Sequence, residues 1–322
     1  MEIAKPSSLQ VRPGTDAEVA EVLRGSKAVW GGGISLEDYV EYHTLIRKHE
    51  WSRENFQHLI LTDEQGQLFS SCKTYLHQVR VEDQELRMAV IGAIFTPLQN
   101  RGMGYASQML EYLLDTLGDQ GVDLIMLFSD IGAEFYARFG FRLVVKKDPI
   151  YGFSEKGLAP AEIAIFNHLP AEVQEWDRTY DRTEKFSLLR SPEYYSLLSE
   201  RISWHQQYMG FKEQKVIVSF ADQSYLWADL SRWRMTVRKF GTGSADAETA
   251  LGRILAAVRD KVGFHDFAGW LPQDFESYRF LKLKEKEPRN RTLMMMATLN
   301  ERARPVHQLT PDEIQFWLAD YF

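Results

Sequence analysis

The sequence has a single cysteine, Cys72, among its 322 residues. The fold therefore cannot depend on an internal disulfide, and the place of Cys72 in a predicted strand favours a packing role over a nucleophilic one. No apolar run approaches the roughly twenty residues that cross a membrane. The N-terminal segment also lacks the apolar core of a signal peptide. These absences predict a cytoplasmic protein with no membrane partner.

Basic residues are too few for a chain that binds nucleic acid without sequence preference. The 38 lysines and arginines are outnumbered by 45 aspartates and glutamates, which gives a net charge of −7. Because such binding needs basic surface to displace counterions, no nucleic-acid partner is expected. The acidic excess is compatible with a cationic substrate such as an amine, although solubility alone also explains it.

Several motifs of other enzyme classes are missing. The eight histidines are scattered, and no cluster of His, Cys and Asp has the spacing of metal ligands, so no metal is expected. The sequence contains no Gly-x-Ser-x-Gly elbow, no Walker phosphate loop and no Gly-x-Gly-x-x-Gly dinucleotide fingerprint. Hydrolase, P-loop and dinucleotide-binding assignments therefore lack support.

The pattern of apolar residues predicts an α/β protein. The chain is long enough for two domains, and 44% of its residues are hydrophobic, enough to fill two cores. Interspersed helical and strand patterns predict mixed sheets with helices on both faces. We place the domain boundary near residue 168, which gives domains of residues 1–168 and 169–322.

Each predicted domain mixes strands and helices. In the first, strands are expected over residues 9–12, 58–62, 68–78, 86–95, 122–128, 141–145 and 162–166, and helices over residues 16–23, 35–48 and 132–139 and after residue 104. In the second, helices are expected over residues 170–185, 192–209 and 247–262, and strands over residues 216–220, 225–230, 234–240, 267–271 and 292–299.

Residues 90–110, VIGAIFTPLQNRGMGYASQML, form the most informative segment. An apolar strand leads into a turn that contains Gly102 and Gly104, and an amphipathic helix follows. Glycine lets the backbone approach a ligand closely, and the unpaired amides at the start of a helix attract phosphate oxygens. The segment is therefore a candidate phosphate-binding loop.

This loop resembles the acetyl-CoA motif of the GNAT N-acetyltransferase superfamily, Arg/Gln-x-x-Gly-x-Gly/Ala after a strand. Two frames fit the motif: Arg101 with Gly104 and Ala106, or Gln99 with Gly102 and Gly104. We prefer the first frame, because it supplies an arginine and keeps the following helix apolar where the family's helix is apolar. The alternative is an ordinary strand-to-helix turn that contains glycine.

A second segment strengthens the resemblance. Residues 128–141 read FSDIGAEFYARFGF, and the FYARFGF part is similar to the GNAT signature in which an aromatic helix leads through a glycine into the next strand. The tyrosine of that signature faces the CoA sulfur. The resemblance therefore assigns to Tyr136 the protonation of the leaving thiolate, whereas Phe135 and Phe139 are expected to pack in the core.

The resemblance implies a GNAT fold and an acetyl-CoA co-substrate whose thioester is attacked by an amine. Backbone N–H groups of residues 92–94 would stabilise the oxyanion, and the pantetheine arm would run along residues 94–96. The pyrophosphate would lie on the amides of residues 101–107, with the Arg101 side chain adding a charge. The implied cofactor-binding residues are Ile94, Phe95, Thr96, Arg101, Gly102, Met103, Gly104, Tyr105, Ala106, Ser107 and Ser129.

The base that deprotonates the acceptor ammonium is not determined by the motifs. Asp38, Glu41, His43 and Asp130 are candidates, although surface charge explains the first two and a core position explains His43. The carboxylate of Phe322 is another, because the apolar chain end suggests docking, as a packed terminus also would. The multidomain mycobacterial aminoglycoside acetyltransferases, which the chain resembles in carrying extra domains, use a C-terminal carboxylate as base.

The second half is expected to be a degenerate GNAT-like domain, with an unrelated α+β domain as the alternative. Its corresponding junction, residues 240–246, contains two glycines but places Asp246 and Glu248 near the helix start. Carboxylates there can cap the helix and would repel a pyrophosphate. No second cofactor site is therefore expected at this junction.

The implied function is transfer of an acetyl group to a primary amine of a small molecule or amino acid. The string Ser-Asp-Ile-Gly-x-x-Phe-Tyr at residues 129–136 resembles fungal acetyltransferases that modify free lysine, which makes lysine the first candidate acceptor. The alternative is a non-catalytic acyl-CoA-binding or regulatory module. The oligomeric state is open, with a homo-oligomer as one option.

Overall fold

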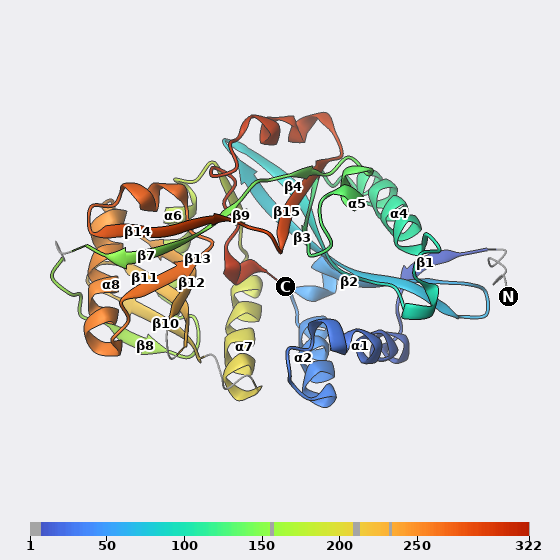
Figure 1. Cartoon of the computed structure of the whole chain (residues 1–322), viewed down its shortest axis with the longest axis horizontal. Helices are drawn as coiled ribbons and strands as arrows, with labels where there is room; N and C mark the ends of the chain where they lie inside the picture. Colours follow the sequence, from blue (N-terminus) through green and yellow to red (C-terminus); the bar gives the residue numbers. More distant parts are fainter. Residues whose placement is uncertain (1–7, 155–157, 209–212, 232–233, 322) are drawn as a thin grey trace. The chain divides into compact units, whose positions relative to one another are not determined.

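A computed structural model describes residues 8–154, 158–208, 213–231 and 234–321 (Figure 1). The chain forms two compact units. The first unit contains the residues up to 78 together with 86–144 and 291–304, and the second contains 79–85, 145–290 and 305–322. Each unit is built on a mixed sheet, in agreement with the α/β class expected from the sequence.

The sheet of the first unit has the strand order β1-β2-β3-β4-β5-β15-β6, and β4 and β5 run parallel. Its helices begin where the sequence predicts: Thr15 and Glu18 form a capping box, and Ser35 accepts from the amide of Asp38. The strands are β1 (Gln10–Pro13), β2 (Phe56–Thr62), β3 (Leu68–Val81), β4 (Gln84–Phe95), β5 (Leu124–Ser129), β6 (Arg142–Leu143) and β15 (Leu293–Thr298). The helices are α1 (Asp16–Trp30), α2 (Leu36–Lys48), α3 (Ser52–Asn55), η1 (Leu98–Asn100), α4 (Tyr105–Asp119) and α5 (Glu134–Ala137).

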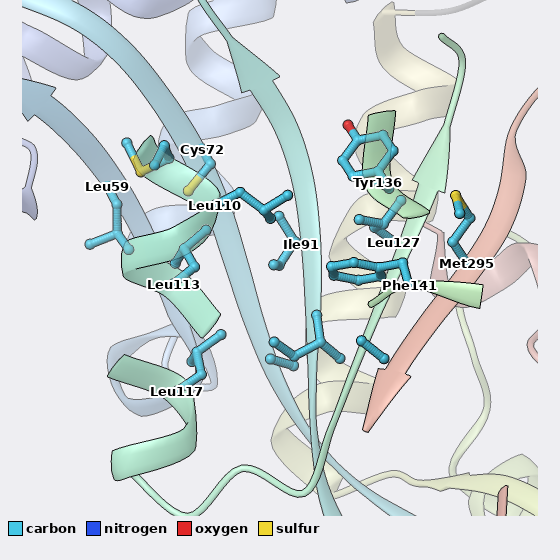
Figure 2. Packing of buried hydrophobic residues seen from close by; sticks show 14 of the residues in the cluster. Leu59, Cys72, Ile91, Leu110, Leu113, Leu117, Leu127, Tyr136, Phe141 and Met295 are labelled. Carbon is cyan, nitrogen blue, oxygen red and sulfur yellow. The ribbon is translucent and has the colours of Figure 1, made fainter. Parts of the chain in front are cut away.

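Apolar side chains fill both faces of this sheet. On one face Leu110 of α4 packs in a cluster with Cys72 of β3 and Ile91 of β4 (Figure 2). On the other face Val22 of α1 packs against Ile60 of β2. Burial is complete at Cys72 and raises the pKa of its thiol, so the predicted packing role of this cysteine is confirmed.

Five strands differ from the sequence prediction: two lie in the sheet not expected for them, and β7 (Lys147–Phe153), β9 (Phe186–Leu189) and β14 (Leu281–Pro288) were not predicted. The strand expected over residues 292–299 of the second domain is β15, which pairs with β5 and β6 in the first sheet. The strand expected to end the first domain is β8 (Ala164–Phe166), which pairs with β10 of the second sheet. The unpredicted β7 pairs with β13 and β14. The units thus divide after residue 144 and not near residue 168.

β15 joins the first sheet because the strands at the centre of a sheet need a hydrogen-bonded neighbour on both sides. Without β15, the edges of β5 and β6 would leave a row of N–H and C=O groups without partners. Met294, Met295 and Met296 are each at most 2% exposed, as a central strand requires. Periodicity alone identifies such a run as a strand but does not say which sheet it enters.

The second unit has the strand order β14-β7-β13-β12-β11-β10-β8. Its parallel pair β12 and β13 is connected by α8, which repeats the β4-α4-β5 arrangement of the first unit and supports the predicted second GNAT-like fold. The remaining strands of this sheet are β10 (Glu213–Ser219), β11 (Ser224–Leu230), β12 (Met235–Thr242), β13 (Asp266–Gly269) and β14 (Leu281–Pro288), whereas β9 (Phe186–Leu189) pairs with β3 of the other sheet. The helices are α6 (Ala171–Asp181), α7 (Pro192–Tyr208), α8 (Ala247–Val262), η2 (Gln273–Ser277), η3 (Glu301–Gln308) and η4 (Leu318–Asp320).

Candidate active site

The two parallel strands of the first unit separate at their carboxyl ends. Hydrogen-bonded register between β4 and β5 runs from Met88 opposite Leu124 to Ile91 opposite Leu127 and ends there among the described residues. The next residue but one, Ala93, has φ 50°, a left-handed conformation that locally bends the strand. The edge of β4 that faces β5 is therefore open over residues 92–94, which are all half-buried.

The loop after β4 presents a row of backbone amides. Within the part of the chain that the structure describes, no amide from Gly102 to Ser107 donates a hydrogen bond; Gln108 is the next to do so, to the carbonyl of Gly104 at 3.1 Å. Gly102 and Gly104 have φ of 78° and 88°, and a Cβ at either would meet nothing within 4 Å. These amides and the N-terminus of α4 can accept an anion, as the sequence predicts.

The side chains of this loop leave the amides exposed. Tyr105 is 2% exposed, and its ring lies 4.7 Å from that of Phe69 in the core, so this bulky residue does not cover the loop. Phe95 is also buried, packed in the cluster of Ile60. Both residues can contribute only backbone groups to a ligand. Arg101 is exposed, and its Nε donates to the carbonyl of Thr96 at 3.1 Å.

Tyr136 lies in α5 with its ring in the core and its hydroxyl pointing away from Leu127 and Phe141 (Figure 2). Burial, with the charge of Asp130 as a second cause, raises the pKa of Tyr136 to about 12. The side chain is therefore protonated at neutral pH and is suited to donate a proton.

Two other predicted residues hold the loop that leads into α5. The hydroxyl of Ser129 donates to the carbonyl of Gly132 at 2.6 Å and accepts from the amide of Ile131. Asp130 accepts from the amide of Thr292 at 3.0 Å. These side chains are engaged in fixing backbone, which assigns Ser129 a positioning contact and weakens Asp130 as a candidate base.

The α2 candidates have different surroundings. Asp38 accepts from Ser35 as part of the helix cap. Glu41 lies exposed on the helix surface. His43, by contrast, is half-buried, and its Nδ1 lies 3.1 Å from the Nζ of Lys73 on β3. Sequence reasoning missed Lys73, because one lysine inside an apolar strand pattern carries no motif.

The chain end is docked in the second unit, as the apolar finish predicts. Trp317 is 1% exposed, and Arg190 binds both carboxylate oxygens of Asp320, at 2.9 and 2.5 Å. Arg201 donates to the carbonyl of Tyr321 at 2.8 Å. Phe322, whose carboxylate is a candidate base, lies outside the described residues.

The corresponding junction of the second unit is closed. Asp246 is the N-cap of α8 and accepts from the amide of Thr249 at 3.0 Å. The amide of Gly243 donates to Gln223, and that of Ser244 donates to Thr242. The predicted capping by Asp246 is confirmed, and the amides before α8 are largely occupied within the chain.

The described residues provide neither a group of metal ligands nor a membrane-spanning helix. Among the described residues, no group of three or more His, Cys, Asp or Glu side chains could hold a metal ion. No helix in the same residues is both long enough and apolar enough to span a membrane.

A strand pair that opens beside a row of unpaired amides at a helix N-terminus is the arrangement that the sequence resemblance to GNAT acetyltransferases implies. Residues 10–144 match the family model "Acetyltransferase (GNAT) domain". The first unit of this chain therefore contains, over residues 10–144, a match to the GNAT acetyltransferase domain.

Relatives agree with this assignment. A lysine acetyltransferase from Yarrowia lipolytica is 26% identical over 149 residues, which cover 38% of this chain and 38% of the relative. The chain thus spans well under half of that protein. A probable N-acyltransferase of unknown function from Enterococcus faecalis superposes with a TM-score of 0.68 at 14% identity, covering 91% of this chain and 73% of the other. Eis1 from Mycobacterium abscessus gives 0.61 at 14% identity, with 91% and 74% covered. These two structures show a shared fold across both units.

Proposed function

We propose that the chain transfers an acetyl group from acetyl-CoA to a primary amine of a small molecule or amino acid. The observation that carries this proposal is the row of unpaired amides from Gly102 to Ser107, next to the open edge of β4. An extended pantetheine arm can pair with such an edge, while a pyrophosphate requires several N–H donors at a helix N-terminus. The residues present therefore fit the co-substrate.

The protein groups then have distinct tasks in the reaction. Backbone N–H groups over residues 92–94 stabilise the negative charge that develops on the thioester oxygen. The neutral amine attacks the carbonyl carbon, the C–S bond breaks, and the hydroxyl of Tyr136 donates its proton to the departing sulfur. Tyr136 recovers a proton from the nitrogen of the new amide.

Free lysine is our first candidate acceptor. It is supported by the local sequence resemblance at residues 129–136 and by the name of the Yarrowia relative. The second candidate function is a non-catalytic acyl-CoA-binding module, which would use the same amides but not Tyr136. A Tyr136→Phe variant separates the two functions, because only an enzyme loses turnover while it keeps its cofactor affinity.

Calorimetric titration with acetyl-CoA tests the site directly. We expect binding to the natural chain and none to a Gly104→Glu variant, whose carboxylate would lie where the anion binds. A panel of amines led by lysine then tests turnover. If neither chain binds acetyl-CoA, the cofactor proposal is wrong; if the natural chain binds it but acetylates no amine, the non-catalytic function is favoured.

A further inference from the structure

A lysine lies buried on the face of β3 that is turned toward α2. Lys73 is 6% exposed, and its Nζ is 3.1 Å from Nδ1 and 3.4 Å from Nε2 of His43. No described carboxylate forms an ion pair with this ammonium. Burying a cation costs free energy unless the cation is paired with an opposite charge or loses its proton.

Unsatisfied polar atoms surround this lysine. His58 on β2 stands opposite Lys73 in the strand register and is 5% exposed, yet neither of its ring nitrogens has a hydrogen-bond partner. The hydroxyl of Ser71, two residues before Lys73 on the same face of β3, is buried without a partner as well. Buried polar atoms are nearly always paired in native proteins, so these atoms indicate a polar ligand or ordered water beside Lys73.

This polar face adjoins the open part of β4. Tyr75 follows Lys73 by two residues and therefore points to the same side of β3. The ring of Tyr75 lies 3.7 Å from the position that a Cβ would occupy on Gly92, and nothing else comes within 4 Å of that position. Gly92 begins the segment of β4 that has left β5. Tyr75 thus connects the segment of β4 that has left β5 with the face of β3 that carries Lys73.

Burial favours the neutral form of Lys73. Burial lowers the pKa of Lys73 to about 7, and burial followed by the charges of Lys73 and Arg47 lowers the pKa of His58 to about 3. Lys73 can therefore carry a lone pair near neutral pH. The titratable and charged groups around it are His43, Tyr39, Tyr42 and Arg47 on α2, His58 on β2 and Tyr75 on β3.

We propose that Lys73, held in place by His43, accepts the proton of the acceptor ammonium at an amine subsite between β3 and α2, beside Gly92. The inference rests on the proposed acetyltransferase function and names its base. One N–H bond of the acceptor ammonium breaks, directly or through one water, and its proton binds the lone pair of Lys73. The acceptor's nitrogen lone pair then attacks the thioester, and half-buried His43 passes the proton from Lys73 to solvent.

The test is the pH dependence of kcat/KM for lysine acetylation by the full chain between pH 6 and 9. We expect the natural enzyme to lose activity about tenfold per pH unit below pH 7, where Lys73 is protonated. Lys73→Met should lower kcat by roughly 100-fold and remove the fall in activity on the acidic side of the pH profile (its acidic limb), with an unchanged Kd for acetyl-CoA. Lys73→Arg should not rescue, because an arginine keeps the charge but cannot accept a proton. His43→Gln should shift the limb.

A matched control is His77→Gln, four residues further along the same face of β3, where His77 stacks on Trp51 at 5.2 Å. It should retain the natural rate and profile. Wild-type kcat/KM and an unmoved limb in Lys73→Met would overturn the inference but leave the proposed function intact. Should the natural chain acetylate no amine at all, the proposed function itself fails. Residues added after Phe322 should not abolish turnover, because a Phe322 carboxylate base is not needed here.

Discussion

Gly104 and Asp246 hold equivalent places in the two units: each directly precedes the helix that connects a pair of parallel strands. Gly104 has no side chain and adopts a left-handed φ, so the amides at the start of α4 stay open. Asp246 places a carboxylate on the amide of Thr249 and closes the start of α8. One residue type at one position thus separates a helix start with open amides from a capped one.

Exchange of these residue types should exchange their effects. Gly104→Asp is expected to weaken acetyl-CoA binding by 10-fold or more in calorimetry, because its carboxylate repels phosphate and can occupy a helix amide. Gly104→Ala is the control for backbone strain at φ 88°, which lowers stability by about 1 kcal/mol but adds no charge. Equal losses of affinity in both variants would assign the effect to the backbone.

Tyr136→Phe should lower kcat by roughly 100- to 10,000-fold, the range for loss of one general acid, with a Kd for acetyl-CoA within about twofold of the natural value. Because the pKa of Tyr136 is about 12, its loss should remove no limb from the pH profile between pH 6 and 9. Stopped-assay kinetics and calorimetry check both points. Phe135→Leu, a neighbouring core change, should alter stability more than kcat.

Lys73→Met should stabilise the protein at neutral pH. Burial depresses the pKa of Lys73 from 10.5 to about 7, so the folded state loses stability as the pH falls from 10.5 to 7, and the full loss persists below 7. The shift corresponds to a gain on the order of 4 kcal/mol for the variant at pH 7. Urea unfolding at pH 7 and 9.5 measures it: the gain should shrink at the higher pH. A constant gain would mean that Lys73 is not the titrating group.

Asp320→Asn should loosen the docked chain end. It weakens a pair with Arg190 in which both side chains are at most 2% exposed, and breaking such a buried pair costs about 3–5 kcal/mol. The remaining contact of Arg190 with Asp181 at 2.6 Å places the expected loss near the lower figure. Urea unfolding and proteolysis of the last residues report the change. Glu313→Gln, which breaks the exposed pair with Lys185, is the control and should behave like the natural chain.

Local patterns in the sequence predict much of this molecule. The helices expected from residues 16 and 35 begin there, capped by Thr15 and Ser35, and the loop around Gly102 and Gly104 has the open amides expected of it. Such features depend on neighbours in the chain. The burial of the Tyr105 side chain was not predictable, because whether a residue at a helix start turns inward depends on its partner, here Phe69.

Features that depend on distant segments were missed. The pairing of His43 with Lys73 brings together a helix and a strand thirty residues apart, and neither residue belongs to a motif. The strand at residues 293–298 was recognised, but its neighbours β5 and β6 were not. An apolar strand can pair with any compatible edge, so the choice is made by the whole fold.

The position of β15 also constrains how the protein can be made. During synthesis, β6 is complete 150 residues before Leu293 is added. Leu293 is the first residue of β15, the strand that pairs with β6. Until then β5 presents an open apolar edge, which is a template for pairing with another chain. The first unit therefore completes its sheet only after β15 has been synthesised, and a fragment that stops at the end of β6 should be aggregation-prone and unable to fold on its own.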